Sequence, residues 1–549
     1  MSPTIISTER CLEIPDELIR VLRESIACRQ IQAGLQCLEN NRHFLLSFRG
    51  EARNAPEFLG YVAQWVDIGY ADVSLVRELL SRMPPAVRRL LSVTAYVHVH
   101  MAEALVAMHE EEHGRAISHL DTALLLASEI EARELAAIVN FWKARCHRKQ
   151  GEYDDAFAHT VRGRDMALDC GLPRMAAVMR VLESWLQFQR GKHKEALSTL
   201  REAETVLSAT DDHVSVGNIL STYGRIFRQE GRLDASVESF ARSIAEFRKQ
   251  DPNHGSLART LANMAYVKRL VALQLRKRID AETARRRRKG TGETASPTSA
   301  FRERFETLRQ EAFAELDEAA GIYKLHMNHR GSGTVHLHRG FLYYDNGELD
   351  SASEEAALAH ALGSEKDDYI LKSRARILQC MVENGKLEEG IEEGGDARQH
   401  AQAAIDYARE AVELAKHTQN RRLLARAYTW YGLTQANEFF DALDAARESM
   451  NVAASYVQTD FHDTAWDDLQ ALKQRLVKSS KVHDVLQAWS MGMVGDKTFQ
   501  QITEEFAAIV IPKVWEIEGC KVSRVAERLS ISPKKVRRIL IQTGRLRAQ

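Results

Sequence analysis

The chain has few cysteines and few prolines, and each shortage excludes a class of protein. Its 549 residues include seven cysteines and 10 prolines. The cysteines are scattered without C-x-x-C spacing, which argues against a disulfide framework or a cysteine-bound zinc and favours a reducing cytoplasm. The shortage of proline, together with abundant Ala, Leu, Glu and Arg and no clear strand alternation, favours an all-α protein.

Long apolar runs and a leader sequence are also missing. The sequence contains no run of 18 apolar residues, so we expect no transmembrane helix and no membrane partner. The start of the chain, MSPTIISTERCLEIPDELIR, lacks the basic segment and apolar centre of a signal peptide. These features predict a cytoplasmic protein.

The middle of the chain repeats with a period of 40 residues. Glu111, Gly151, Gly191 and Gly231 share this spacing, and small or apolar residues follow each of them at fixed offsets. The in-phase sets are Ala116, Ala156, Ala196 and Ser236; Leu120, Thr160, Leu200 and Phe240; and Ala123, Gly163, Ala203 and Ser243. A fixed period of this kind is typical of a helical solenoid, with glycine at the turn and small residues where two helices approach closely.

The pattern resembles the tetratricopeptide repeat (TPR) family. It is clearest in YGRIFRQEGRLDASVESF and in RGFLYYDNGELDSASEEAALA. In the second segment the consensus positions are held by Gly340, Tyr343, Tyr344, Gly347, Leu349, Ala352 and Ala359. The period of 40 rather than the family's usual ~34 residues implies longer helices or turns. The resemblance implies an all-α fold, a TPR-like α-solenoid of helical pairs.

We divide the chain into three regions. Residues 1–90 are helical in pattern without a clear repeat, and we interpret them as a cap on the solenoid. Residues 91–480 form the solenoid, and residues 497–549 form a small C-terminal domain.

A segment of low complexity interrupts the solenoid. A long helix is expected over 256–280, followed by the basic run Arg285–Lys289 and the sequence GTGETASPTSA. This composition predicts a disordered basic insertion near 282–300, after which the helical pattern resumes at Phe301.

Patterns typical of enzymes are absent or are better explained by the repeat. There is no GxxxxGK[ST] loop, which excludes the common P-loop ATPases. His109–His113 matches the H-E-x-x-H zinc pattern, but Glu111 falls at a predicted turn, so the two histidines would not share one helical face. The glycine-rich segment 329–340 suggests a phosphate cradle, yet Gly340 fits a repeat position. We therefore predict no enzyme, no cofactor and no metal.

The last thirty-one residues are strongly basic, with nine Lys/Arg against one acid, whereas the whole chain carries a net charge of -1. One apolar helical face is formed by Val522, Val525, Ala526 and Leu529. Ser532 as N-cap and Pro533 as first residue start a second helix with Val536, Ile539 and Leu540 on its apolar face, and Gly544 ends it. Two helices joined by a turn of about four residues, with Ile531 as a buried plug, predict a helix-turn-helix.

This segment resembles the Fis-type helix-turn-helix at the C-terminus of bacterial enhancer-binding regulators. The similar residues are VSRVAERLSIS, PKKVRRIL and the closing glycine, within roughly residues 497–545. Ser530 stands where the family usually has glycine, and Lys521 where it usually has asparagine. Helices are also expected over Phe499–Val510 and Pro512–Glu518, and in that family the equivalent helices pair two subunits. The resemblance implies binding of double-stranded DNA by a homodimer.

The second helix of this motif exposes several cations. We expect Lys534, Lys535 and Arg538 nearest the bases, and Arg524, Arg545 and Arg547 at phosphates. The complete predicted DNA-binding set is Arg524, Lys534, Lys535, Arg537, Arg538, Arg545 and Arg547.

The concave groove of a solenoid binds peptides or protein segments through the first helix of each pair. Candidate groove residues are Asn140, Lys143, Arg180, Asn218, Tyr223, Asn263 and His336. Together the two parts predict a cytoplasmic bacterial transcription regulator whose solenoid senses a protein, peptide or small ligand. The alternative is a TPR interaction scaffold whose basic tail contacts RNA or an acidic protein.

Overall fold

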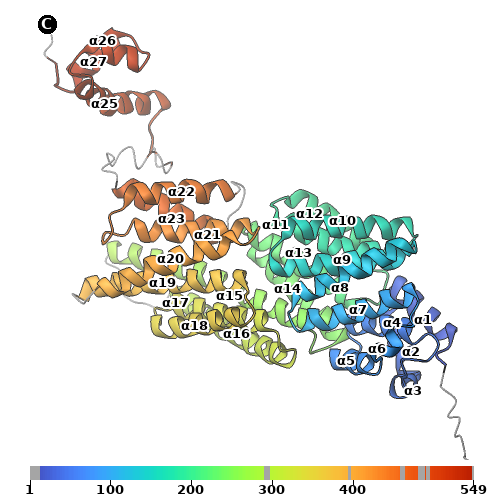
Figure 1. The fold of residues 1–549 in the computed structure, drawn as a ribbon. Helices are drawn as coiled ribbons and strands as arrows, with labels where there is room; N and C mark the ends of the chain where they lie inside the picture. Colours follow the sequence, from blue (N-terminus) through green and yellow to red (C-terminus); the bar gives the residue numbers. More distant parts are fainter. Residues whose placement is uncertain are drawn as a thin grey trace, which may run out of the picture.

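The computed structural model describes residues 13–289, 297–393, 397–457, 464–479, 489, 492 and 495–546, and every regular element within them is an α-helix. Figure 1 shows the helices stacked side by side in pairs, with the last three gathered into a group of their own at the C-terminal end. The all-α solenoid predicted from the repeat is therefore confirmed. No described helix combines the length and hydropathy that a membrane span needs.

The first region consists of short helices of unequal length. They are α1 (Asp16–Ala27), α2 (Ile31–Asn40), α3 (Arg42–Leu46), α4 (Ala55–Ile68), α5 (Val73–Ser81) and α6 (Pro85–Arg88). Phe58, Leu59 and Trp65 of α4 are fully buried, because α4 packs against the first repeat helix, α7 (Val93–His109). Burial of these large side chains joins the region to the solenoid as one core.

The 40-residue period corresponds to two helices and two short turns. The helices that follow α7 are α8 (His113–Glu129), α9 (Arg133–Gln150), α10 (Tyr153–Asp169), α11 (Pro173–Gln189), α12 (His193–Leu207), α13 (His213–Gln229) and α14 (Leu233–Gln250). The predicted turn residues Glu111, Gly151, Gly191 and Gly231 all have positive φ, between 59° and 87°. Glu111 thus separates the two histidines of the H-E-x-x-H pattern onto α7 and α8, as predicted.

Small residues are required where the paired helices cross. The side chains of Ala116, Ala156, Ala196 and Ser236 are completely buried. A Cβ added to Gly163 would lie 2.9 Å from the carbonyl oxygen of Ala137, which is too close for any larger residue. The glycines of the 329–340 segment have the same role, since Gly331 and Gly333 pack against Tyr323 and Leu371.

The second half continues the pairs, and three of its helices, with 35, 29 and 25 residues, are longer than those of the first half. Its helices are α15 (Gly255–Lys289), α16 (Pro297–Leu325), α17 (His329–Asp345), α18 (Leu349–Glu365), α19 (Tyr369–Glu393), α20 (Arg398–Lys416), α21 (Arg421–Gln435), α22 (Leu443–Tyr456) and α23 (Thr464–Ser479). The backbone stays helical through the basic run 285–289 and is helical again from Pro297, so both flanks of the predicted insertion were placed wrongly. Residues 290–296 lie outside the described part.

The coil of helices closes on itself at two places. Arg29, between α1 and α2, forms an ion pair of 2.6 Å with Asp212, and the backbone N–H groups of Ile31 and Gln32 donate to the Asp211 carboxylate at 2.8 Å. We call these the closure contacts. Further along, the N–H of Gln419 donates to the carbonyl of Gly151 at 3.0 Å. Turns distant in sequence therefore enclose a space inside the solenoid.

The C-terminal group contains α25 (Phe499–Ile517), α26 (Val522–Arg528) and α27 (Pro533–Gln542). The break that we expected between Val510 and Pro512 is wrong, because α25 runs through Pro512. Proline removes one helical hydrogen bond, but Ile511 and Pro512 are both buried, and Ile511 belongs to the core shared with the other two helices. Tertiary packing therefore holds the helix together.

Candidate functional site

The three C-terminal helices form a small core from the residues that the sequence placed on apolar faces. The buried members are Ile511, Val525, Ala526, Val536, Ile539 and Leu540. Ile531 packs against this core from the turn, and the Ser532 hydroxyl accepts from the Lys535 N–H at 3.2 Å. The predicted plug and N-cap are thus both present.

Two positions at which the sequence departs from the Fis-type pattern have visible consequences. Ser530 adopts the left-handed conformation, with φ of 49°, that the family's glycine would enter without strain. Lys521 precedes α26 without a side-chain capping bond. The turn forms despite both substitutions.

The cations of α27 lie on the side away from the core. Lys534, Arg537 and Arg538 are exposed and Lys535 is half-buried; we call these four the helix cations. Arg538 lies 3.3 Å from Glu504. Of the predicted phosphate contacts, Arg524 is exposed, Arg545 pairs with Glu516 at 2.9 Å, and Arg547 lies outside the described residues.

Inside the solenoid, a cavity of about 220 Å³ lies between Arg29 of the closure contacts and the start of α15. Its lining comes from α4, α9, α11, α13, α15 and the turns beside them, and includes the hydroxyls of Ser215, Ser221, Thr222 and Ser256. Phe141, Trp185 and Leu182 supply an apolar side. Five arginines also line it: Arg29, Arg145, Arg148, Arg225 and Arg259.

The five arginines fall into two groups. Arg29 pairs with Asp212, and Arg145 pairs with Asp67, the carboxylate among the cavity-lining residues. Within the described part of the chain, Arg148, Arg225 and Arg259 form no ion pair; we call these three the cavity arginines. One terminal nitrogen of Arg259, Nη2, donates to neutral partners, Asn218 at 2.6 Å and Ser256 at 2.9 Å. The Nε atoms of all three cavity arginines have no hydrogen-bond partner.

The surroundings oppose positive charge at the cavity arginines. Burial and then the neighbouring guanidinium of Arg259 lower the pKa of Arg148 to about 9. Burial and the same neighbour lower the pKa of Arg225 well below its ordinary value. Beside them, burial together with Arg330 and Arg148 lowers the pKa of Lys149 to about 7. An anion placed among these groups would remove the repulsion.

Most of the predicted groove residues form hydrogen bonds or ion pairs with other side chains of the solenoid. Asn218 lines the cavity and accepts from Arg259. Four others bond to acidic side chains of neighbouring second helices: Lys143 to Asp121, Arg180 to Glu202, Tyr223 to Glu204, and His336 to Glu355. Asn140 is buried and donates to the carbonyl of Ala136, and Asn263 accepts from Arg228.

The sequence analysis missed the cavity arginines, although the period contained one signal for them. Arg145, Trp185 and Arg225 are each 40 residues apart, so three successive first helices present them at the same place. Arg29 and Arg259 reach the cavity through contacts that bring the end of α1 and the start of α15 next to these first helices.

No protein-family model matches the sequence, and a search of curated proteins finds no match. Among solved structures, the Rap protein complexed with competence and sporulation factor is 11% identical with a TM-score of 0.48, covering 75% of this chain and 98% of that one. The human IFIT1 dimer with m7Gppp-AAAA is 11% identical with a TM-score of 0.45, covering 86% and 97%. The apo quorum sensor NprR from B. thuringiensis is 12% identical with a TM-score of 0.41, covering 80% and 98%. At this identity and overlap, nothing about ligands or partners transfers to this chain.

Proposed function

We propose that this protein is a DNA-binding transcription regulator whose solenoid responds to a bound ligand. The observation that carries the proposal is the arrangement of α26 and α27, two short helices joined by a tight, plugged turn with the helix cations facing outward. A second helix of this kind enters a major groove, where arginine bonds guanine and lysine neutralises phosphate.

The first helix of the group supports action as a dimer. Phe499 and Phe506 lie on the same face of α25 and are 85% and 49% exposed. One motif alone offers few base contacts, and pairing two copies supplies two half-sites one DNA turn apart. Light scattering of the full-length protein tests this: the wild type is expected to be a dimer and Phe506→Glu a monomer. A monomeric wild type contradicts the pairing.

DNA binding is tested with the full-length protein, a labelled random duplex and a single-stranded RNA of equal length. Replacing all four helix cations by alanine is expected to weaken duplex binding about 100-fold. The matched control replaces Lys192, Lys194, Arg201 and Arg242, exposed cations of the solenoid, and removes the same charge. Equal affinities of the two variants would contradict the proposal, and tighter binding of RNA would favour the scaffold alternative.

The ligand that the cavity supports best is a small, multiply charged anion. Three guanidinium groups without acidic partners converge there, hydroxyl groups supply further donors, and the closure contacts limit the length of any occupant. Calorimetry with pyrophosphate and with citrate distinguishes phosphate from carboxylate ligands. Arg225→Met is expected to abolish binding, and exposed Arg242→Met to leave it unchanged; equal behaviour of the two variants contradicts an anion site.

A further inference from the structure

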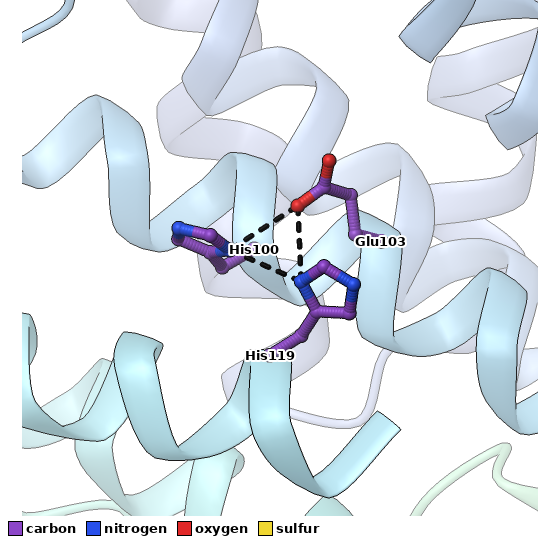
Figure 2. Close-up of side chains that lie close together, drawn as sticks. All are labelled: His100, Glu103 and His119. Carbon is purple, nitrogen blue, oxygen red and sulfur yellow. Dashed lines mark hydrogen bonds and ion pairs between the residues drawn. The ribbon is translucent and has the colours of Figure 1, made fainter. Parts of the chain in front are cut away.

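Three potential metal ligands meet on one side of the first repeat pair. His100 and Glu103 lie one turn apart on α7, and His119 faces them from α8 (Figure 2). The Nδ1 atoms of both histidines lie 3.1 Å from the same carboxylate oxygen, Glu103 Oε2, and 3.2 Å from each other. The three atoms thus form a nearly equilateral triangle.

Hydrogen bonding alone does not satisfy this triangle. If both Nδ1 atoms carry a proton, two donors face each other at 3.2 Å. If one of them is bare, its lone pair faces the carboxylate oxygen at 3.1 Å. While Glu103 is ionised, one contact therefore remains repulsive in every protonation state of the two rings.

A cation just outside the plane of the triangle makes all three contacts favourable. Zn²⁺ takes histidine nitrogens and carboxylate oxygens at about 2.0–2.2 Å, so neighbouring ligands of a tetrahedral site are about 3.3–3.5 Å apart. The observed separations of 3.1 and 3.2 Å are close to this. Side-chain exposure of 18–22% leaves a path for the ion and room for a fourth ligand.

The surroundings orient the carboxylate in the way that metal sites require. Arg88 donates to the other oxygen of Glu103, Oε1, at 2.7 Å, which turns Oε2 toward the two histidines. The ring of Tyr96 stacks on His100 with 6.1 Å between centroids. Groups behind the ligands that fix their orientation are a regular part of metal sites.

The next repeat shows how the same positions look without such a triangle. Forty residues on, Asn140, Lys143 and His159 replace His100, Glu103 and His119. Asn140 Oδ1 and His159 Nδ1 form one hydrogen bond of 2.9 Å, and Lys143 turns away to Asp121. The fold therefore does not need a His–Glu–His set at this place.

We propose that His100, Glu103 and His119 bind a divalent transition metal, with Zn²⁺ fitting best, and that the ion joins α7 to α8 with one coordination position open. This site is separate from the cavity and from the C-terminal helices, and the proposal does not depend on their function.

The test uses the full-length protein stripped with a chelator and titrated with Co²⁺ and Zn²⁺. We expect one ion per chain, with the visible absorption of tetrahedral Co²⁺. His119→Gln and Glu103→Gln are expected to weaken binding about 100-fold or more, and Arg88→Gln about 10- to 100-fold. His159→Gln, the matched change one repeat away, is expected to bind as the wild type does.

Three outcomes would overturn the site: no stoichiometric binding, equal affinity of His119→Gln and the wild type, or loss of binding only when His147 is replaced. His147, Glu152 and Asp155 form the other cluster of potential ligands among the described residues. Circular dichroism of each metal-free variant separates lost ligands from lost fold.

Discussion

The cavity arginines and the helix cations are alike in chemistry and opposite in surroundings. The cavity arginines are held by helices on several sides, lack acidic partners and have lowered pKa values. The helix cations stand on one side of a single helix, where three of them are exposed and Lys535 is half-buried. Keeping an unpaired cation away from water costs free energy, whereas an exposed cation costs almost none.

This difference indicates what each group selects. A set of half-buried guanidinium groups placed around a cavity can recognise an anion by its size and by the number of its charges. An exposed row of cations attracts any polyanion, and specificity must come from the few side chains that reach base edges. In the function that we propose, the cavity would select the ligand and α27 would bind DNA.

The largest effect on stability is expected when a cavity-lining arginine that forms an ion pair is replaced. Arg29→Met leaves the Asp212 carboxylate buried without its cation, and we expect the free energy of unfolding to fall by about 3–5 kcal/mol. Chemical denaturation measures this. A loss below about 1 kcal/mol would mean that the pair adds no more than a surface ion pair does.

The next largest effect is expected from salt, which should weaken DNA binding by the helix cations much more than anion binding by the cavity arginines. If each helix cation neutralises one phosphate, duplex affinity falls about 150-fold between about 50 and 200 mM salt. Partly buried charges are screened less than exposed ones, so binding of a cavity anion should change less over the same range. Fluorescence anisotropy and calorimetry give the two slopes, and equal slopes would remove the distinction.

Replacing an unpaired arginine should raise the stability of the protein, whereas replacing Arg29 should lower it. Arg225→Met removes a desolvated charge that has no acidic partner, so the ligand-free protein should become more stable by about 1–2 kcal/mol. The same change is expected to abolish anion binding, so the variant should gain stability and lose the proposed function. Destabilisation by Arg225→Met would show that the cation already has a stabilising role in the empty cavity.

Stability should rise with pH because of Lys149. Burial and the nearby Arg330 and Arg148 lower its pKa to about 7 from 10.5, and Glu111 only partly opposes them. Between these two values the unfolded chain binds a proton that the folded chain does not, so the free energy of unfolding increases with pH, by at most about 1.4 kcal/mol per unit. Chemical denaturation at pH 7, 8 and 9 should show that the free energy of unfolding rises less steeply with pH in Lys149→Met than in the wild type. Equal slopes for the two proteins would refute the assignment to Lys149.

The smallest effect is expected in the turn before α27. Ser530→Gly removes the strain of a non-glycine residue in the left-handed conformation and should stabilise the C-terminal helices by about 1 kcal/mol. Hydrogen exchange of the α26 and α27 amides measures the gain. Unchanged protection would mean that serine enters this turn without strain.

Local features of the fold were predictable from the sequence, and features made by distant contacts were not. The 40-residue period located Gly151, Gly191 and Gly231 at turns, and the caps and apolar faces located α26 and α27. Helix α25 continued through Pro512 because of packing that a local rule does not contain. The cavity depends on Arg29 meeting Asp212, and no pattern within a single repeat encodes that meeting.

The closure contacts also bear on how the chain reaches its native state. An open solenoid folds from neighbour to neighbour, and each added unit is stable on the last. Here the segment near Arg29 must wait for Asp211 and Asp212, about 180 residues later, before its bonds form. During synthesis the early helices therefore emerge unfinished, and unfolding of this half should occur as one cooperative transition and not as gradual fraying from the end.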